Sequence, residues 1–243
     1  MKFVCFDTNY LLAVLIPLDR WKPIIKLCEK EITELVEKGK VKVFITKLVK
    51  SEAYNRIEKI VKNATRHFKT LFHKLKDTNL KTPFEQNSIL SLRKELQLIL
   101  KEEDDEVIRN QLYYFEDYLL KAIRKFPEKA KKIIIGECLS EINGILTSFD
   151  AELSIYDIDE IADPLDKEEI KKLEKIKTRI NTLVPNFNDK VILATFIYFI
   201  NLHDVSGIFV THDFKHLLLK SLFLEEEFKE INIVRPQYVK FLT

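Results

Sequence analysis

The chain has 243 residues, a length that fits one domain or one domain carrying a large insertion. Hydrophobic residues make up 46% and charged residues 32% of it, which predicts a sizeable core and excludes wholesale disorder. The 40 basic and 38 acidic residues leave a net charge of only +2, so binding to a polyanion would need a local basic patch. The spacing of the glycines excludes the Gly-rich phosphate-binding loops of dinucleotide-binding folds and P-loop enzymes.

Targeting and redox signals are weak. The three cysteines are odd in number and widely spaced, which disfavours a disulfide framework and a zinc ribbon. Residues 3–18 begin like a signal peptide, but Asp7 interrupts the apolar run early. The longest apolar stretch, residues 191–200, is too short to cross a bilayer. We therefore expect a cytoplasmic protein with no membrane association.

Short β-prone runs alternate with longer helical patterns along much of the chain. The expected strands are residues 2–6, 41–45, 152–158, 207–211 and 231–234. The expected helices are residues 10–16, 23–38, one capped by Thr46, 166–183 and 188–202. Because strands separated by helices need crossover connections, this pattern predicts a three-layer α/β/α sandwich around a parallel sheet of about five strands.

The interval from residue 60 to residue 150 departs from this alternation. It carries three or more helical patterns and no convincing strand. We therefore expect an α/β core formed by residues 1–60 and 150–243, with residues 61–149 as a helical insertion.

Four acids are expected at one edge of this sheet. Parallel α/β sheets place functional groups at the carboxyl ends of their strands. Asp7 directly follows the first strand, and Asp213 comes shortly after the fourth. Glu52 lies early in the helix after the second strand, and Asp189 begins the helix that leads to the fourth. Four separate segments would thus bring carboxylates together.

Clustered carboxylates repel one another unless a cation or a proton neutralises them. A ligand set of oxygen atoms alone favours Mg²⁺ or Mn²⁺, which can activate a water for phosphodiester hydrolysis. The alternative interpretation is that these acids only cap helices, as Asp189 or Asp213 would at the start of a helix.

Four segments in this order resemble the motifs of the PIN-domain nucleases. They are residues 6–12 (FDTNYLL), 45–57 (ITKLVKSEAYNRI), 188–199 (NDKVILATFIYF) and 209–217 (FVTHDFKHL). The resemblance covers residues 1–60 and 150–243. The interval between the second and third motifs is longer than in compact members of the family, and the expected helical insertion accounts for it.

The resemblance implies a PIN-like fold and a Mg²⁺- or Mn²⁺-dependent endoribonuclease. The residues that it implies as holders of the metal and its hydrolytic water are Asp7, Glu52, Asp189 and Asp213. It further implies that Asn9 and Thr211 orient ligands or water by hydrogen bonds. The alternative is that Asn9 caps a helix and Thr211 is an ordinary strand residue.

A basic segment follows Glu52. Residues 56–81 contain eight basic and two acidic residues. On a continuous helix, several of the basic side chains share the face of Glu52 or its flank. They are Arg56, Lys59, Lys62, Arg66 and Lys69. This face could track an RNA backbone, or it could simply be a solvated helix face.

Two further groups have mainly structural interpretations. Tyr113, Tyr114 and Tyr118 could stack on unpaired bases, but their spacing is more typical of a core or an interface. His212 and His216 have a spacing that can bind zinc, but no third ligand accompanies them.

The expected function is hydrolysis of single-stranded or structured RNA by a metal-dependent endoribonuclease. One alternative is a PIN-like RNA-binding or assembly scaffold without significant catalysis. Others are the toxin of a toxin–antitoxin pair and a nuclease acting on DNA flaps. A homodimer and a protein partner on the helical insertion are compatible with the sequence, which demonstrates neither.

Overall fold

The computed structural model describes the chain except for residues 16–21, 75–80, 102–105, 156–157 and 165. The described residues form two compact units. The first contains Met1–Leu15, residues 22–53 and Asp150–Thr243, and the second contains Tyr54–Phe149.

The first unit is built on a five-stranded sheet in which every neighbouring pair of strands is parallel. The strands are β1 (Lys2–Phe6), β2 (Val41–Thr46), β3 (Asp159–Ile161), β4 (Gly207–Val210) and β5 (Ile231–Val234). Their order across the sheet is β3-β2-β1-β4-β5. At the centre, Val4 pairs with Val43 on one side and with Ile208 on the other, and all three are buried. The parallel α/β sheet expected from the sequence is therefore confirmed.

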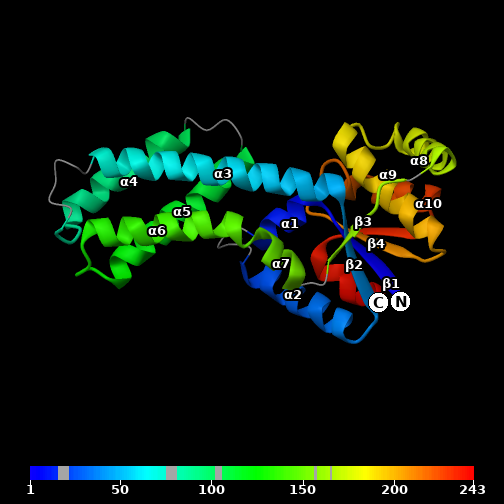
Figure 1. The fold of residues 1–243 in the computed structure, drawn as a ribbon, viewed down its shortest axis with the longest axis horizontal. Helices are drawn as coiled ribbons and strands as arrows, with labels where there is room; N and C mark the ends of the chain where they lie inside the picture. The colour runs from blue at the N-terminus through cyan, green and yellow to red at the C-terminus, as the bar shows by residue number, and fades with distance from the viewer. Residues whose placement is uncertain (16–21, 75–80, 102–105, 156–157, 165) are drawn as a thin grey trace. The chain divides into compact units, whose positions relative to one another are not determined.

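Helices cover both faces of this sheet (Figure 1). The helices of the first unit are α1 (Thr8–Leu15), α2 (Lys22–Glu37), α8 (Lys167–Ile180), α9 (Phe187–Leu202), α10 (Ser221–Glu227) and α11 (Val239–Leu242). Helix α9 packs against β2, β3 and β4, with α8 outside it. Helix α2 packs against β2 and α11 against β4, on the other side of the sheet in Figure 1. Short 3-10 turns, Leu218–Lys220 and Pro236–Tyr238, complete the unit.

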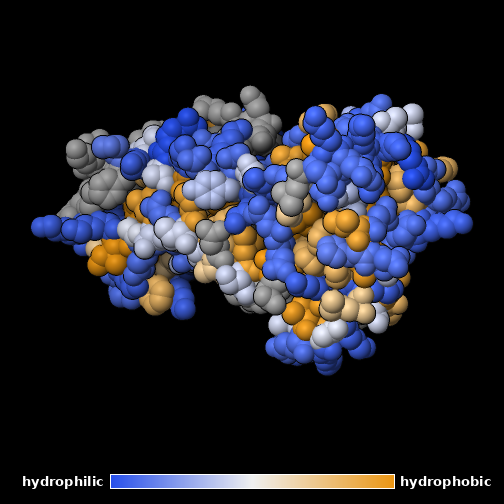
Figure 2. All heavy atoms as spheres, turned by 45° about the vertical axis from the view of Figure 1, so that its right-hand side comes forward, coloured by the Kyte–Doolittle hydropathy of each residue, from blue (hydrophilic) through white to orange (hydrophobic). Residues whose placement is uncertain are grey.

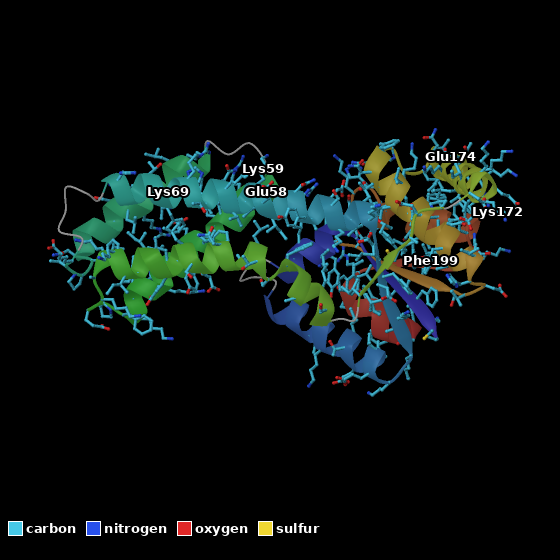
Figure 3. The ribbon with its side chains drawn as sticks, in the orientation of Figure 1. Glu58, Lys59, Lys69, Lys172, Glu174 and Phe199 are labelled. Carbon is cyan, nitrogen blue, oxygen red and sulfur yellow. The ribbon has the colours of Figure 1, made fainter. Side chains whose placement is uncertain are left out.

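Helix α9 is apolar on nearly all sides and forms the centre of the core. Its Phe199 (Figure 3) lies with its ring centroid 5.5 Å from that of Phe3 and 4.8 Å from that of Phe44. At the start of β4, a Cβ on Gly207 would come within 2.7 Å of the Phe196 ring. Glycine at this position therefore permits the close approach of α9 to the sheet.

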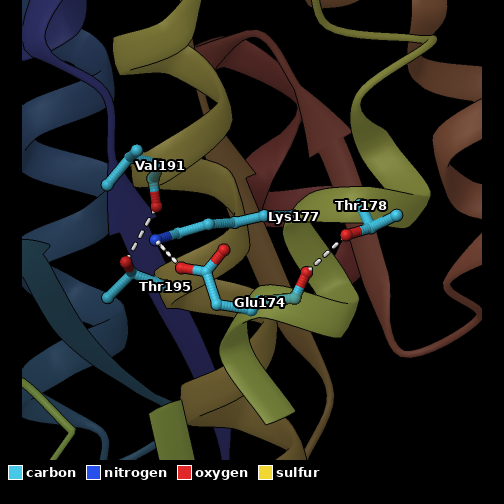
Figure 4. A network of polar contacts seen from close by, with 5 residues as sticks. All are labelled: Glu174, Lys177, Thr178, Val191 and Thr195. Carbon is cyan, nitrogen blue, oxygen red and sulfur yellow. Dashed lines mark hydrogen bonds and ion pairs between the residues drawn. The ribbon is translucent and has the colours of Figure 1, made fainter. Parts of the chain in front are cut away.

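Figure 4 shows polar contacts within α8 and within α9. Lys177 Nζ lies 2.7 Å from Glu174 Oε1, and the hydroxyl of Thr195 donates to the Val191 carbonyl at 2.8 Å. The side chains that α8 buries are apolar, namely Leu173, Ile176 and Ile180. Apolar burial therefore contributes to the contact between the two helices, together with polar contacts of Tyr198 with Glu169 and of Lys190 with Asn181.

The expected strand at residues 152–158 is wrong. Phe149–Ile155 form helix α7, residues 156–157 lie outside the described part, and β3 is only Asp159–Ile161. The segment alternates like a strand, but Phe149 and Leu153 are both buried, and their spacing of four places them on one helix face. Tertiary packing of these two side chains overrides the local pattern.

The other expected elements of the first unit are confirmed, with shifts of a few residues at their ends. Thr46 accepts a hydrogen bond from the amide of Val49 at 3.2 Å, which is the expected helix cap. Asp166 caps α8 by accepting from the amides of Glu168 and Glu169. Of the expected helix at residues 10–16, Ile16 lies outside the described residues.

The regular secondary structure described in the second unit is all helical, and residues 81–85 and 126–130 form irregular connections. It contains most of α3 (Lys47–Lys74), with α4 (Gln86–Lys101), α5 (Glu106–Lys125) and α6 (Lys131–Thr147). Helix α5 packs against both α4 and α6. The side chains of Leu96, Phe115, Leu119 and Ile135 are among those buried here. Within the described ranges, no helix of the chain is long and apolar enough to span a membrane.

Candidate functional site

The strand order changes direction between β1 and β4, which are neighbours in the sheet. The chain runs outward from β1 to β2 and β3, and then crosses back to β4 and β5 on the other side. The loops after β1 and β4 therefore diverge, and such a switch point is where open α/β sheets bind ligands. Asp7 directly follows β1, and its amide donates to the Val210 carbonyl of β4 at 2.9 Å. Asp7 thus stands at the switch point.

The side chain of Asp7 is buried and hydrogen-bonded at both oxygens. Asp7 is only 3% exposed. Oδ1 accepts from the amide of Thr8 at 2.8 Å, and Oδ2 accepts from the hydroxyl of Thr211 at 2.7 Å. These bonds fix the carboxyl in one orientation and offset part of the cost of its burial.

Glu52 reaches the same edge from α3. Its Oε2 accepts from the hydroxyl of Thr8 at 2.8 Å, and its Oε1 accepts from the side-chain amide of Asn188. Thr8 therefore contacts both acids, with its amide on Asp7 and its hydroxyl on Glu52. Asn188 adds a link from the first turn of α9.

The other two acids lie in short hydrogen-bonded turns. Asp213 receives the amide of His216 at 2.8 Å on Oδ1, and its own amide donates to the Thr211 hydroxyl at 2.9 Å. Asp189 lies in the first turn of α9, where its amide donates to the Asn186 side chain at 3.2 Å. Asp213 thus makes the cap-like bond of the structural alternative. The cap of α9 is Asn186, and not Asp189.

Three of the four acids lie close enough to interact electrostatically. The pKa of Asp7 is raised from 3.8 to about 7, chiefly by burial and further by the charges of Asp189 and Asp213. The hydrogen bonds from Thr211 and Thr8 act in the opposite direction. Asp7 is therefore close to half-protonated at neutral pH, as expected for an acid that shares a confined edge with others.

The neighbouring thiol is not an alternative nucleophile. Burial and the charge of Asp7 raise the pKa of Cys5 well above its usual value. Cys5 therefore stays protonated.

The four acids do not form a closed metal cage. Among the described residues, no group of three or more His, Cys, Asp or Glu side chains is arranged to hold a metal ion. The oxygens of Asp7 and Glu52 face hydroxyl and amide donors instead. Carboxylate oxygens are the ligand type that hard divalent cations prefer, but the described geometry does not bring three of these acids around one point.

Two residues that orient the acids were not expected from the sequence. Thr8 and Asn188 make the contacts to Glu52, whereas Asn9 is half-buried and has no described hydrogen bond to these acids. Each lies next to an acid in the chain, Thr8 beside Asp7 and Asn188 beside Asp189. This adjacency in the sequence was the signal that could have identified Thr8 and Asn188 as contacts of the acids. Thr211 makes the contact to Asp7 that an orienting role requires.

The two histidines after β4 differ in their surroundings. Burial and the neighbouring Arg235 lower the pKa of His212, whose ring centroid lies 5.6 Å from that of Tyr10. No described cluster joins His212 and His216 to a third metal ligand. In the second unit, Tyr113 is exposed and Tyr118 half-buried, and the Tyr114 side chain lies outside the described residues.

The five basic residues expected on the face of Glu52 lie in the part of α3 that belongs to the second unit. Lys59, Lys62, Arg66 and Lys69 are exposed, and Arg56 is half-buried. Figure 3 shows Lys59 and Lys69 along α3. Lys62 forms an ion pair with Glu58 at 2.9 Å, one turn earlier on the same helix. On the face drawn in Figure 2, hydrophilic side chains are interspersed with apolar ones.

Comparisons with protein families, with curated proteins and with solved structures found no match.

Proposed function

We propose that this chain is a metal-dependent ribonuclease. Its site is formed by Asp7, Glu52, Asp189 and Asp213 at the carboxyl ends of β1 and β4, and we call this site the carboxylate edge. The observation that supports this most is the placement of Asp7. It is buried at the switch point of the sheet, and the charges of Asp189 and Asp213 help to raise its pKa to about 7. Keeping like charges together in a buried position is unfavourable, and such arrangements cluster at functional sites.

Mg²⁺ or Mn²⁺ would be held by Asp7, Glu52, Asp189 and Asp213, with water completing its shell. When bound, the ion would supply an activated water and neutralise charge on the phosphate. The protein's own contribution is orientation. Thr8 and Thr211 fix Asp7, while Thr8 and Asn188 fix Glu52. Because metal ligands must be deprotonated, the cation competes with the proton on Asp7.

RNA as the substrate rests on the resemblance to PIN-domain nucleases and on the basic side chains of α3. The five-stranded parallel sheet is the architecture which that resemblance implies. Exposed lysines and arginines can bind the phosphate backbone without sequence preference. We place this activity in the cytoplasm, since Cys5, Cys28 and Cys138 are free thiols, as a reducing compartment favours.

The test is cleavage of a labelled RNA of mixed sequence and of a matched DNA. Wild type and Asp7→Asn are compared in Mg²⁺, in Mn²⁺ and in EDTA. We expect wild type to cut RNA only with a metal, and Asp7→Asn to lose at least a hundredfold in rate, because it removes a ligand that other residues hold in place. Glu230→Gln is the control, because this exposed acid precedes β5 at the opposite edge of the sheet. A variant Asp7→Asn that cuts like wild type would contradict the proposal.

A second candidate is an RNA-binding scaffold. Two observations favour it, namely that the described acids form no metal cage and that Asp213 receives a structural hydrogen bond from His216. When binding of the same labelled RNA is measured beside cleavage, the scaffold predicts binding that is equal in Mg²⁺ and EDTA, without cleavage in either.

A further inference from the structure

An aromatic ring and a guanidinium group lie against each other beside the carboxylate edge. Phe214 immediately follows Asp213, and Arg235 immediately follows β5. The guanidinium carbon of Arg235 lies 5.3 Å from the centroid of the Phe214 ring. This is a cation–π contact, and both residues come from the ends of neighbouring strands.

The backbone fixes this pair at the same edge as the acids. Val210 pairs with Val234, and the amide of Thr211 donates to the Val234 carbonyl at 3.1 Å. The residues after β4 and β5 therefore leave the sheet side by side. The turn carrying Phe214 is closed by a bond from the Leu219 amide to the Phe214 carbonyl at 3.0 Å. Phe214 is thus held by its backbone while its ring stays in solvent.

The pair is available for binding. Phe214 is 52% exposed, and Arg235 is exposed as well. Within the described part of the chain, Arg235 has no carboxylate at ion-pair distance. Its guanidinium contacts the ring of Phe214 and influences His212. An unneutralised cation beside an exposed ring is suited to a phosphate and a base at the same time.

We propose that Phe214 and Arg235 bind one nucleotide of a single-stranded RNA, with the base stacked on Phe214 and the phosphate on Arg235. A base in a duplex has neighbours on both faces, so only an unpaired base can stack on the ring. This platform therefore selects single-stranded over double-stranded RNA. The assignment of its role to substrate positioning rests on the proposed nuclease function. The binding itself does not.

The test is binding of a fluorescent single-stranded RNA and of a fully paired duplex containing the same sequence, measured in EDTA so that no cleavage occurs. The full chain carries Phe214→Ala, Phe214→Trp or Arg235→Ala. Phe241→Ala is the control, since Phe241 is an aromatic residue of the same unit that is 72% exposed.

We expect Phe214→Ala to weaken single-strand binding by roughly tenfold, because base–aromatic stacking has this magnitude. Phe214→Trp should restore it, and binding of the duplex should change less than twofold. Arg235→Ala should weaken binding and lower its salt dependence by about one phosphate contact. Phe241→Ala should bind like wild type.

The inference is overturned if Phe214→Ala binds the single strand like wild type, if it weakens duplex binding equally, or if wild type binds no single strand. The nuclease proposal is judged separately, by metal-dependent cleavage. A protein that binds as expected in EDTA but never cuts would keep this inference and lose the proposed function. If wild type cuts RNA and Phe214→Ala binds the single strand normally, the proposed function is kept and this inference is lost.

Discussion

Asp7 is held by two threonines in a place where a carboxylate is unfavourable. Burial raises its pKa to about 7, although the bonds from Thr211 and Thr8 favour the charged form. The charges of Asp189 and Asp213 raise this pKa further. The residue therefore costs stability whenever it is ionised and no cation is present, and this cost can be measured.

We predict that Asp7→Asn flattens the pH dependence of stability in EDTA. Between about pH 4 and pH 7 the folded protein keeps the Asp7 proton and the unfolded chain loses it, so wild type loses stability as the pH rises through this window. Asparagine carries no charge at any pH. The variant should match wild type near pH 4 and exceed its free energy of unfolding at pH 8 by about 2–4 kcal/mol, since each pKa unit corresponds to about 1.4 kcal/mol.

Urea unfolding in EDTA at pH 4, 6 and 8 gives these free energies. Glu230→Gln, which changes an exposed acid, should follow the wild-type curve. Parallel curves for wild type and Asp7→Asn would show that the buried acid is not protonated at neutral pH.

The position of Asp7 could be predicted from the sequence, because an acid that ends a buried parallel strand has only one edge to occupy. The partners of the acids were harder to identify. The contacts of Glu52 come from Thr8 and Asn188, which are far from it in the chain and meet it only through tertiary packing. Asn9 was expected in this orienting role, but the described contact is made by Thr8.

At the scale of elements, the first turn of α9 connects folding to the site. Asn186 caps the helix by accepting from the amides of Asn188 at 2.8 Å and Asp189 at 3.2 Å. The same cap therefore holds two residues of the carboxylate edge. Asp166 caps α8 in the same way, with bonds of 2.8 Å from Glu168 and Glu169. The two caps differ in what they hold. Asn188 and Asp189 belong to the proposed site, whereas Glu168 and Glu169 have no proposed role.

We predict that Asn186→Ala and Asp166→Ala each lower the free energy of unfolding by about 1 kcal/mol, the usual loss on removing an N-cap. Only Asn186→Ala should also slow RNA cleavage, because it frees the turn that carries Asn188 and Asp189. Thermal unfolding and initial cleavage rates in Mn²⁺ check both effects. Equal cleavage rates for two equally destabilised variants would show that the start of α9 does not set the geometry of the site.

The elements that the sequence predicts correctly have consistent local signals. Helix α9 is apolar over its length and starts at an Asn cap, and β1, β2, β4 and β5 are short buried runs between polar turns. The error at residues 152–158 arose where the local pattern was ambiguous. The segment alternates like a strand, yet the burial of Phe149 and Leu153 makes it a helix, and the edge strand β3 follows with little apolar signal.

At the scale of the whole molecule, charge is balanced overall and uneven locally. The net charge of +2 gives no general attraction to RNA. The exposed Lys59, Lys62, Arg66 and Lys69 are grouped along one helix of the second unit. If this group binds RNA, the effect of removing it should differ from the effect of an equal change of charge elsewhere in that unit.

We predict that Lys59→Glu with Arg66→Glu weakens RNA binding at least tenfold and lowers the slope of its salt dependence by about one to two, since each lost phosphate contact removes about one unit of slope. The matched control is Lys94→Glu with Lys132→Glu, which alters the charge equally at two exposed positions on α4 and α6. Binding of each protein to a labelled RNA is measured in EDTA from 50 to 200 mM salt, a range over which phosphate contacts change affinity strongly. Equal losses in the two variants would assign the effect to net charge. Unchanged binding in the first would leave this face of α3 as a solvated surface, and RNA would then have to be bound by the carboxylate edge of the first unit alone.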